Sequence, residues 1–279
     1  MSRGERATVI QNLSNSMRHN YEEHGVEEYY RKVAATYRNP HYPGIRTSLF
    51  TWLNKWWSAA GASKDGSKVV LFDMACGKLP TVAFAEWFKT GRSLHLQTKQ
   101  NDFVPAPTLV PRRKVQYLSI DDTFPEPLVM ASDPFTSQAF MDRTGYSCAK
   151  LSFEDISEGT WPGKATNIST DIQRDLPTEE EINSEESEGF HGPLVQMVVC
   201  SFAMHLIQEP SELFSLLFQL SSRALWLVIL APHKKPEIKE GWGWTRWDIH
   251  NWCETTITDH RGDLLNDRVH CRVYRSNQF

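Results

Sequence analysis

The sequence predicts an α/β fold with a doubly wound, mostly parallel sheet, an antiparallel last strand and N-terminal helices. Two apolar runs, "VVLFDM" at 69–74 and "LWLVILAP" at 225–232, have the character of strands buried on both faces. The first run is followed by a glycine turn and by the helix-like stretch "TVAFAEWF", in which Thr81 is the candidate N-cap. The C-terminal stretch "RVHCRVYRS" alternates like an edge strand of an antiparallel hairpin.

Two helices are expected ahead of the sheet. Apolar residues recur at helical spacing over 26–37 and again over 45–56, and the stretch "RNPHYPG" separates the two runs. The small and polar residues at 58–67 are typical of a linker. We therefore expect an N-terminal helical extension or lid at 1–67 and an α/β domain at 68–279.

Two stretches of the α/β domain are interpreted as insertions. Residues 89–127 lack clean periodicity, are dotted with prolines and contain one strand-like run at 115–120. Residues 157–193 include the acidic run "TEEEINSEESEG", which has almost nothing apolar to bury. A mobile loop is expected at 177–190, with a regulatory role as the alternative.

Around these insertions, strands and helices continue to alternate. A strand over "PLVMAS" is expected to end at Asp133, with a following helix closed by Gly145. A third strand is expected to end at Glu154 and Asp155. The run 195–200 predicts a fourth strand, and a helix follows Pro210.

Composition excludes several classes of protein. The chain has 279 residues and a formal net charge of −4, which argues against a broad nucleic-acid surface, although a local basic groove stays open. Its basic clusters at 112–114 and 233–235 are interpreted as solvated loops.

The five cysteines form no CxxC pair, and the His and Cys residues near the C-terminus match no common zinc spacing, so reduced thiols and no metal are expected. No run approaches the ~18 apolar residues of a membrane span, and a cytoplasmic or nuclear protein is expected.

Ligands of an open α/β sheet lie at the carboxyl ends of its strands. A carboxylate after the second strand can accept both ribose hydroxyl hydrogens, an aromatic beside it can cover a purine, and an acid after the third can accept from an adenine amine. Asp121 is a rival of Asp133 for the ribose, and ordinary spacing to the next elements favours Asp133. The residues that the sequence places at these ends are Asp73, Ala75, Cys76, Gly77, Asp133, Pro134, Phe135, Phe153, Glu154, Asp155, Cys200, Ser201, Phe202, His205, Pro232 and His233.

The same residues resemble the class I S-adenosylmethionine-dependent methyltransferases, which have a Rossmann-like fold. "VVLFDMACG", "VMASDPF", "LSFEDI" and "VQMVVCSFAMHLI" are similar to four motifs of that superfamily in the right order, and the resemblance runs from about Val69 to Tyr274. "DPFTSQAFMDRTG" and "LAPHKKPEIKEGWGW" are also similar to poorly characterised fungal members, which implies no substrate.

The resemblance implies S-adenosyl-L-methionine as the cofactor. It would place Asp73, Ala75 and Gly77 at the methionine end and Asp133 at the ribose. Phe135 and Asp155 would flank the adenine, and residues 200–202 would lie under the transferring methyl. Cys76 and Cys200 are interpreted as small core residues.

Methyl transfer from a sulfonium is an in-line displacement, so the protein mainly aligns donor and acceptor and excludes water. A base is needed only where the acceptor loses a proton, and His205 and His233 are the best-placed candidates, with structural roles as the alternative.

The sequence "CSFA" lacks the Asn/Asp-Pro-Pro-aromatic turn that clamps a planar amine, which disfavours methylation of an exocyclic base amine. The acceptor stays open among small molecules, proteins and RNA, and a protein partner is conceivable. The aromatic N-terminal helices and "GWGWTRW" at 241–247 either close over a substrate or pack in the core.

Two departures from the superfamily pattern keep other functions open. Leu79 stands where a further glycine is usual, and the spacing from Asp73 to Asp133 exceeds the ~20 residues of a mononucleotide unit. Leu79 is harmless if the helix begins there with Pro80 in its first turn, and obstructs the cofactor if its side chain fills the pocket. The alternatives are an inactive methyltransferase-fold scaffold and an NAD-type Rossmann oxidoreductase, the latter disfavoured because no G-x-G-x-x-G turn is present.

Overall fold

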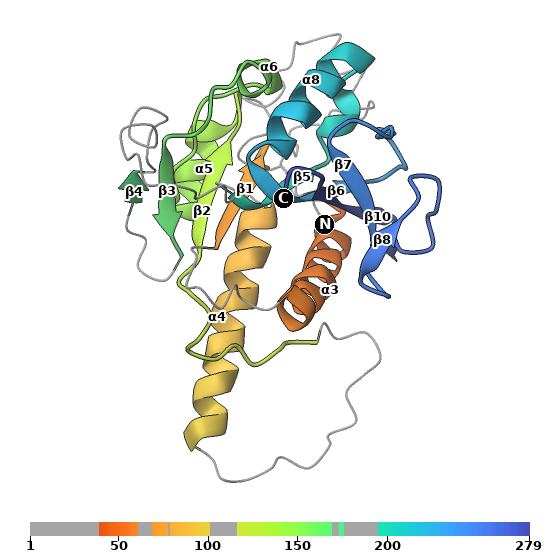
Figure 1. Ribbon diagram of the computed structural model, residues 1–279. Helices are drawn as coiled ribbons and strands as arrows, with labels where there is room; N and C mark the ends of the chain where they lie inside the picture. The colour runs from red at the N-terminus through yellow and green to blue at the C-terminus, as the bar shows by residue number, and fades with distance from the viewer. Residues whose placement is uncertain (1–38, 61–68, 78, 101–115, 169–172, 176–194) are drawn as a thin grey trace, which may run out of the picture. The chain divides into compact units, whose positions relative to one another are not determined.

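A computed structural model describes residues 39–60, 69–77, 79–100, 116–168, 173–175 and 195–279 (Figure 1). Residues 39–279 form one compact unit. The predicted helix at 26–37 and the acidic run at 177–190 lie outside the described residues. No helix in the described ranges combines the length and apolar character that a membrane span requires.

A mixed sheet with the strand order β4-β3-β2-β1-β5-β6-β10-β7-β8 organises this unit. Its centre is parallel and consists of β2 (Leu128–Ser132), β1 (Val70–Met74), β5 (Val195–Ser201) and β6 (Ala224–Ala231). The last strand, β10 (Val269–Ser276), is antiparallel to β6 and to β7 (Trp244–Asp248). The predicted Rossmann-like α/β class with a reversed last strand is therefore confirmed, and the four parallel strands end at one edge of the sheet.

Short antiparallel strands extend both sides of this centre. β3 (Lys164–Asn167) pairs with β2, and β4 (Gln173–Asp175) pairs with β3. β8 (Cys253–Thr255) pairs with β7, and β9 (Leu264–Asn266) forms a hairpin with β10.

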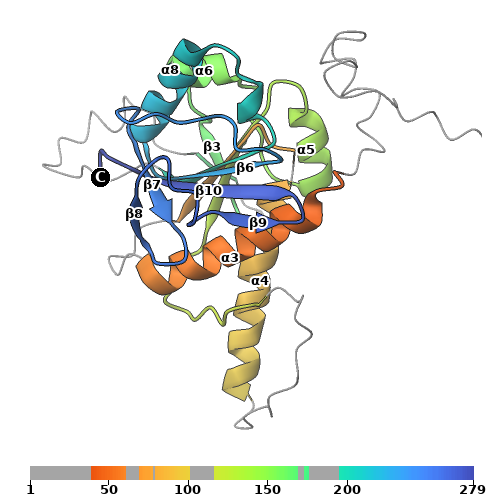
Figure 2. The same ribbon diagram turned by 90° about the vertical axis from the view of Figure 1, so that its right-hand side faces the viewer.

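Helices cover both faces of the sheet, as Figure 2 shows with the sheet close to edge-on. On one face lie α3 (Tyr42–Ala60) and α4 (Leu79–Gln100), and on the other lie α6 (Phe153–Ser157) and α8 (Pro210–Ser221). Side chains of β1 alternate between two hydrophobic clusters, with Leu71 on the α3 and α4 side and Phe72 on the opposite side. Because both faces are buried, these strands appear in the sequence as continuous apolar runs.

Packed tryptophans join α3 to the C-terminal strands. Trp52 of α3, Trp226 of β6, Trp247 of β7 and Trp252 have ring centroids 5.2 to 6.0 Å apart. Trp244 is buried as well, and its indole N–H donates to the carbonyl oxygen of Leu217 at 2.8 Å. Of the two roles expected for aromatic residues here, closing over a substrate or packing in the core, these tryptophans have the second. Helix α3 packs in the hydrophobic cluster of the unit that begins at Asn39, and the boundary expected at residue 67 stays a prediction.

The predicted position of the last strand was wrong in one respect, because β10 lies between two strands and not at an edge. Its alternation of polar and apolar residues suggested one solvated face. The polar residue Arg272 is instead 1% exposed, since three backbone carbonyls accept hydrogen bonds from its guanidinium. A buried arginine whose terminal nitrogens donate to carbonyls has the same sequence pattern as a solvated one.

The insertion predicted to begin at residue 89 was also wrong at its start. α4 continues for 22 residues to Gln100, and residues 116–120 run beside it without forming a strand. The amide of Ile120 donates to the carbonyl oxygen of Gly91 at 3.0 Å, and Arg92 donates to the backbone of Asp121 and Phe124. Backbone groups of this segment therefore find hydrogen-bond partners on α4 instead of on a neighbouring strand.

A third parallel strand is reduced to one bridge. Ala149 pairs with Ser132 as an isolated parallel bridge, while Phe153, Glu154 and Asp155 belong to helix α6. The predicted strand that ends at Glu154 and Asp155 was therefore wrong. The local capping of α6, described below, ends extended structure before Phe153.

Candidate functional site

The loops that follow β1, β2, β5 and β6 meet at the carboxyl edge of the parallel strands. Ser201 is the last residue of β5, Pro134 follows Asp133 in the loop after β2, and both are half-buried. Backbone bonds join neighbouring loops, because the amide of Cys76 donates to Ser132 and that of Phe202 donates to Leu230. The structure thus brings the predicted residues of these four loops to one place.

Asp73 is the buried acid of this edge. Its Oδ2 accepts hydrogen bonds from the backbone N–H of Thr81 at 3.1 Å and from the Thr81 hydroxyl at 2.7 Å. Its Oδ1 is buried and has no hydrogen-bond partner among the described residues. Burial raises the pKa of this carboxyl to about 7, although the two Thr81 bonds lower it, and the charge of Asp133 raises it further.

Thr81 was predicted as the N-cap of the helix, and this was wrong. α4 begins at Leu79, which makes Thr81 its third residue, and the Asp73 carboxylate accepts the Thr81 amide. An acid at a helix N-terminus also interacts favourably with the helix dipole. Asp73 therefore anchors α4 with one oxygen and leaves the other free of the helix.

Two non-glycine residues in these loops have a left-handed backbone conformation. Ala75, after β1, and Phe202, after β5, both have φ of 59°. Residues held in this region cost about 1 kcal/mol or more each and are concentrated at functional sites. Gly77 is exposed, and a Cβ built on it would meet no atom within 4 Å. The turn after β1 is thus strained at Ala75 and open at Gly77.

Leu79 is the first residue of α4, and Pro80 is the second. Proline suits the first turn of a helix because its missing N–H would have no intrahelical partner there. The Leu79 side chain is half-buried and packs against the hydrophobic cluster on the α3 and α4 side of the sheet. It therefore contributes to the core of that face.

The thiols of the site are buried and held neutral. The Cys76 and Cys148 sulfur atoms lie 3.1 Å apart, and both cysteines are free. Burial, together with this contact, raises the pKa of Cys76. Burial raises the pKa of Cys200 to about 12. These thiols accordingly resemble core residues more than nucleophiles.

Asp133 follows β2 and organises its own loop. Its Oδ1 accepts hydrogen bonds from the amides of Phe135 at 2.8 Å and Thr136 at 2.6 Å. Burial raises its pKa, although these bonds oppose the change. Its rival Asp121 accepts from Thr123 and lies beside Arg92, more than three turns along α4 from the N-terminus of that helix. Asp133, unlike Asp121, is therefore at the edge with Asp73.

The acids predicted to flank the adenine serve the start of α6. Oδ2 of Asp155 accepts from the amide and the hydroxyl of Ser152, each at 2.7 Å, while the Ser152 hydroxyl accepts from the Asp155 amide at 3.1 Å. These reciprocal bonds form a capping box and lower the pKa of Asp155. Glu154 is exposed, and Phe153 packs against the cluster on the α6 and α8 side. The pattern [ST]-x-x-[DE] at 152–155 was the available signal for this cap.

Histidines gather at the ends of β5 and β6. The rings of His205 and His233 lie 6.3 Å apart and nearly perpendicular, and His233 is exposed. Burial is the main cause that lowers the pKa of His205, and the charge of His233 lowers it further. The His205 imidazole is therefore neutral at pH 7. His41, just before α3, stacks on Phe202 with ring centroids 5.0 Å apart. The sequence analysis missed His41, because its stretch "RNPHYPG" indicated only the end of a helix.

Within the described residues, no group of three or more His, Cys, Asp or Glu side chains could hold a metal ion. The half-exposed Phe135 lies beside Asp133. The edge thus offers two acids and a strained turn on the β1 and β2 side, and aromatic and imidazole rings on the β5 and β6 side.

No family model matches the chain. The fission yeast (Schizosaccharomyces pombe) protein C17A5.05c, which is named as uncharacterized, is 34% identical to it over 271 residues, spanning 97% of this chain and 96% of that protein. The chain belongs to the family of this fission yeast protein. The matched residues span almost the full length of both proteins. The name of the yeast member implies no activity for the family.

Two solved structures have a weaker likeness to this family member. One is magnesium protoporphyrin IX methyltransferase (ChlM) from Synechocystis PCC 6803 with bound SAM, at 10% identity and a TM-score of 0.40, covering 95% of this chain and 98% of that one. The other, titled for the conversion of a disulfide bond into a thioacetal group during echinomycin biosynthesis, has 10% identity, a TM-score of 0.34 and coverage of 81% and 80%. The fold assignment rests on the sheet topology described above.

Proposed function

We propose that the protein transfers a methyl group from S-adenosyl-L-methionine, with the cofactor held by the loops after β1 and β2. One observation carries this proposal: the fully buried Asp73 has an oxygen that no described residue bonds, and it lies beside the strained turn at Ala75 and the open Gly77. The motif resemblance of the sequence supports the same function.

The charges of the site suit this cofactor. S-adenosyl-L-methionine has a positive sulfonium and a positive α-ammonium group. Asp73 and Asp133 interact electrostatically, and no described cation contributes to the pKa of either. A buried, unpaired carboxylate oxygen is costly unless a donor or a cation meets it. A ligand ammonium at Oδ1 of Asp73 would satisfy this oxygen.

Other residues of the edge fit the remaining parts of the cofactor. With Oδ1 of Asp133 bound to two amides, its second carboxylate oxygen is the acceptor for ribose hydroxyls. We assign the half-exposed Phe135, which follows Asp133 by two residues, to the adenine. We assign Asp155 to the capping box and not to the adenine.

When bound, the cofactor supplies an electrophilic methyl group on a sulfonium. The chain aligns the acceptor and excludes water, and the stacked rings of His41 and Phe202 provide a wall for this purpose. His205 is neutral at pH 7 and can accept a proton that the acceptor loses. Neither Cys76 nor Cys200 is needed, since direct displacement requires no covalent intermediate.

Calorimetry tests the proposal with S-adenosyl-L-methionine, its demethylated product and NAD. The wild type is expected to bind the first two. Asp133→Asn keeps an oxygen for the Phe135 and Thr136 amides but loses its charge, and we expect about tenfold weaker binding. The matched control is Asp121→Asn, which removes an acid beside Arg92 and should bind as the wild type does.

The other outcomes are equally informative. A folded wild-type protein that binds neither methionine-derived ligand would overturn the proposal. Binding of NAD in their place would favour the oxidoreductase. Binding without methyl transfer to any acceptor would favour the inactive scaffold, whose main sequence argument weakens because Leu79 packs in the core.

A further inference from the structure

We propose that the methyl acceptor is a small molecule with an anionic group, a carboxylate or a phosphate, which binds beside the loop after β6. This inference rests on the proposed function and concerns its substrate. The "β6 loop" is residues 232–236, and with His270 of β10 it forms a cationic site next to His205.

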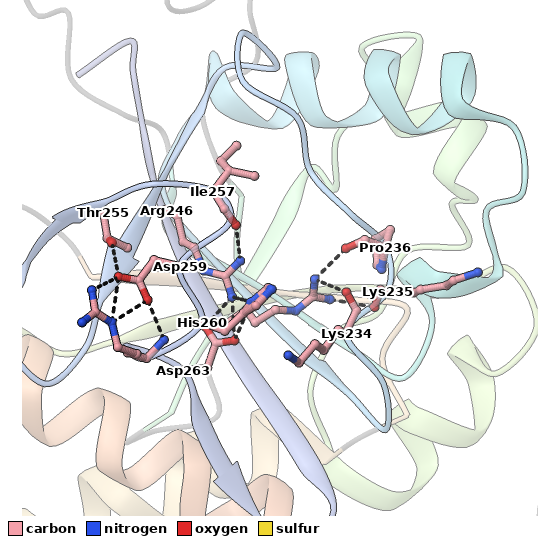
Figure 3. A network of polar contacts seen from close by, with 11 residues as sticks. Lys234, Lys235, Pro236, Arg246, Thr255, Ile257, Asp259, His260 and Asp263 are labelled. Atoms are coloured by element: carbon pink, nitrogen blue, oxygen red, sulfur yellow. Dashed lines mark hydrogen bonds and ion pairs between the residues drawn. The ribbon is translucent and has the colours of Figure 1, made fainter.

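Arg272 anchors the β6 loop from beneath. Its Nη1 donates to the carbonyl oxygens of Lys234 at 2.8 Å and Pro236 at 2.6 Å, and its Nη2 donates to that of Lys235 at 2.6 Å. Three successive carbonyls are thereby bound to one rigid guanidinium, and Figure 3 shows the carbonyl-bearing residues side by side. A binding loop fixed in this way loses little entropy when a ligand arrives.

The charged side chains buried beneath the loop include more cations than anions. Arg246 and Asp263 form a buried pair, with the Arg246 Nη2 donating to both carboxylate oxygens, and His260 joins them (Figure 3). The partners described for Arg272 are three backbone carbonyls and the Tyr274 hydroxyl, and no carboxylate is among them. Two buried guanidiniums therefore share one buried carboxylate, and the remaining positive charge lies under the β6 loop.

Lys234 adds a positive charge on the outer side of the loop, where two histidines also lie. His233 and Lys234 are exposed, and His270 is half-buried on β10. Burial is the main cause that lowers the pKa of His270. The nearby charges of Arg272, Lys234 and His233 also lower it, whereas that of Asp263 raises it. These groups therefore share one neighbourhood. Lys235 differs, because its side chain extends away from Lys234 in Figure 3.

The cationic site adjoins the place assigned to the transferring methyl. The His233 ring is 6.3 Å from that of His205, and a 2.8 Å bond from the Phe202 amide to the Leu230 carbonyl joins the ends of β5 and β6. Asp73, near the end of β1, and Asp133, just after β2, lie on the other side. A cationic cofactor and an anionic acceptor would each meet opposite charge along one edge.

The size of the site favours a small acceptor. The chain has a net charge of −4, and the cationic site comprises one short loop and one strand position. Nucleic-acid binding usually neutralises several phosphates over a wider surface. One carboxylate or phosphate group matches a site of this extent, with the exposed Lys234 and the neighbouring His233 and His270.

The test uses inorganic phosphate and citrate as separate probes, with calorimetry at low salt and without cofactor. We expect millimolar binding of at least one, which distinguishes the phosphate from the carboxylate. Lys234→Ala should weaken that binding about three- to tenfold, because one nearby charge is lost. The control Lys235→Ala removes the same charge from the same loop and should change the affinity less than about twofold.

NMR gives a second measurement on the wild type. Ring proton signals of His233 and His270 should shift with the bound probe, while those of the exposed His250 should not. Absence of binding by both probes, or equal loss in the two lysine variants, would overturn the inference. Because no cofactor is present, failure to bind S-adenosyl-L-methionine would reject only the proposed function, and failure to bind either anion would reject only the acceptor class.

Discussion

Asp73 has two roles that a single carboxylate can combine because its oxygens face different partners. Oδ2 holds Thr81 and thereby the first turn of α4, while Oδ1 is buried and accepts no hydrogen bond from the part of the chain that the structure describes. The first role is structural, at the start of α4, and the second is the proposed binding of the cofactor. The geometry makes them compatible, since the helix uses one oxygen and the proposed ammonium would use the other.

The pKa of Asp73 predicts that cofactor binding depends on pH. Its folded value of about 7 means that the carboxylate is increasingly protonated below pH 7, whereas a cationic ligand requires the ionised form. The affinity for S-adenosyl-L-methionine should therefore fall as pH decreases from 7 to 5.5, by up to about tenfold per unit, with proton release on binding. The raised pKa of Asp133 acts in the same direction. Calorimetry in buffers of different ionisation enthalpy measures both quantities.

Asp73→Asn is the control for this prediction. In the free wild-type protein the folded state retains a proton that the unfolded state releases between pH 4 and 7, so the contribution of Asp73 to stability falls as pH rises through this range. The variant should gain stability relative to the wild type from pH 4.5 to 8, by on the order of 2 to 4 kcal/mol in urea unfolding. A parallel pH profile for the two proteins would contradict the assignment of this pKa.

At the scale of elements, the strands buried on both faces were predictable and the capped or docked segments were not. β1, β5 and β6 appear in the sequence as apolar runs because both of their faces are covered. The start of α6 and the buried position of β10 depend on hydrogen bonds of Asp155 and Arg272 with particular partners. Such bonds place polar residues where hydrophobic periodicity predicts solvent or a different element.

The docking of residues 116–124 on α4 gives a prediction at this scale. A Cβ on Gly91 would lie 2.5 Å from the Cδ1 of Ile120 and 2.8 Å from the Leu118 carbonyl oxygen. Gly91→Ala should gain helix propensity but displace this segment, for a net loss of about 1 to 2 kcal/mol in urea unfolding. Gly163→Ala is the control, because its Cβ would meet no atom within 4 Å. Equal or higher stability of the Gly91 variant would show that the segment yields without cost.

At the scale of the whole molecule, charge is separated along one edge of the sheet. The acids follow β1 and β2, and the cations surround the end of β6 and the start of β10. The sequence analysis identified the acids because each directly follows an apolar run. It interpreted residues 233–235 as a solvated loop, because the buried Arg272 that organises them lies 36 to 38 residues further along the chain. Only the pairing of β6 with β10 brings these two segments together.

This separation predicts that cofactor and anion bind cooperatively. The sulfonium of S-adenosyl-L-methionine is positive, whereas the sulfur of the demethylated product is neutral. One unit charge about 10 Å from the anion, at an effective dielectric of about 40 to 80, contributes about 0.4 to 0.8 kcal/mol, or about two- to fourfold in affinity. The protein saturated with S-adenosyl-L-methionine should thus bind phosphate or citrate about two- to fourfold more tightly than the protein saturated with the product, and the reciprocal effect must be equal. Calorimetric titration of the probe into each complex measures this ratio, which should decrease at higher salt and in Lys234→Ala. A ratio of one would place the anion beyond the reach of the sulfonium and would separate the cationic site from the acceptor position.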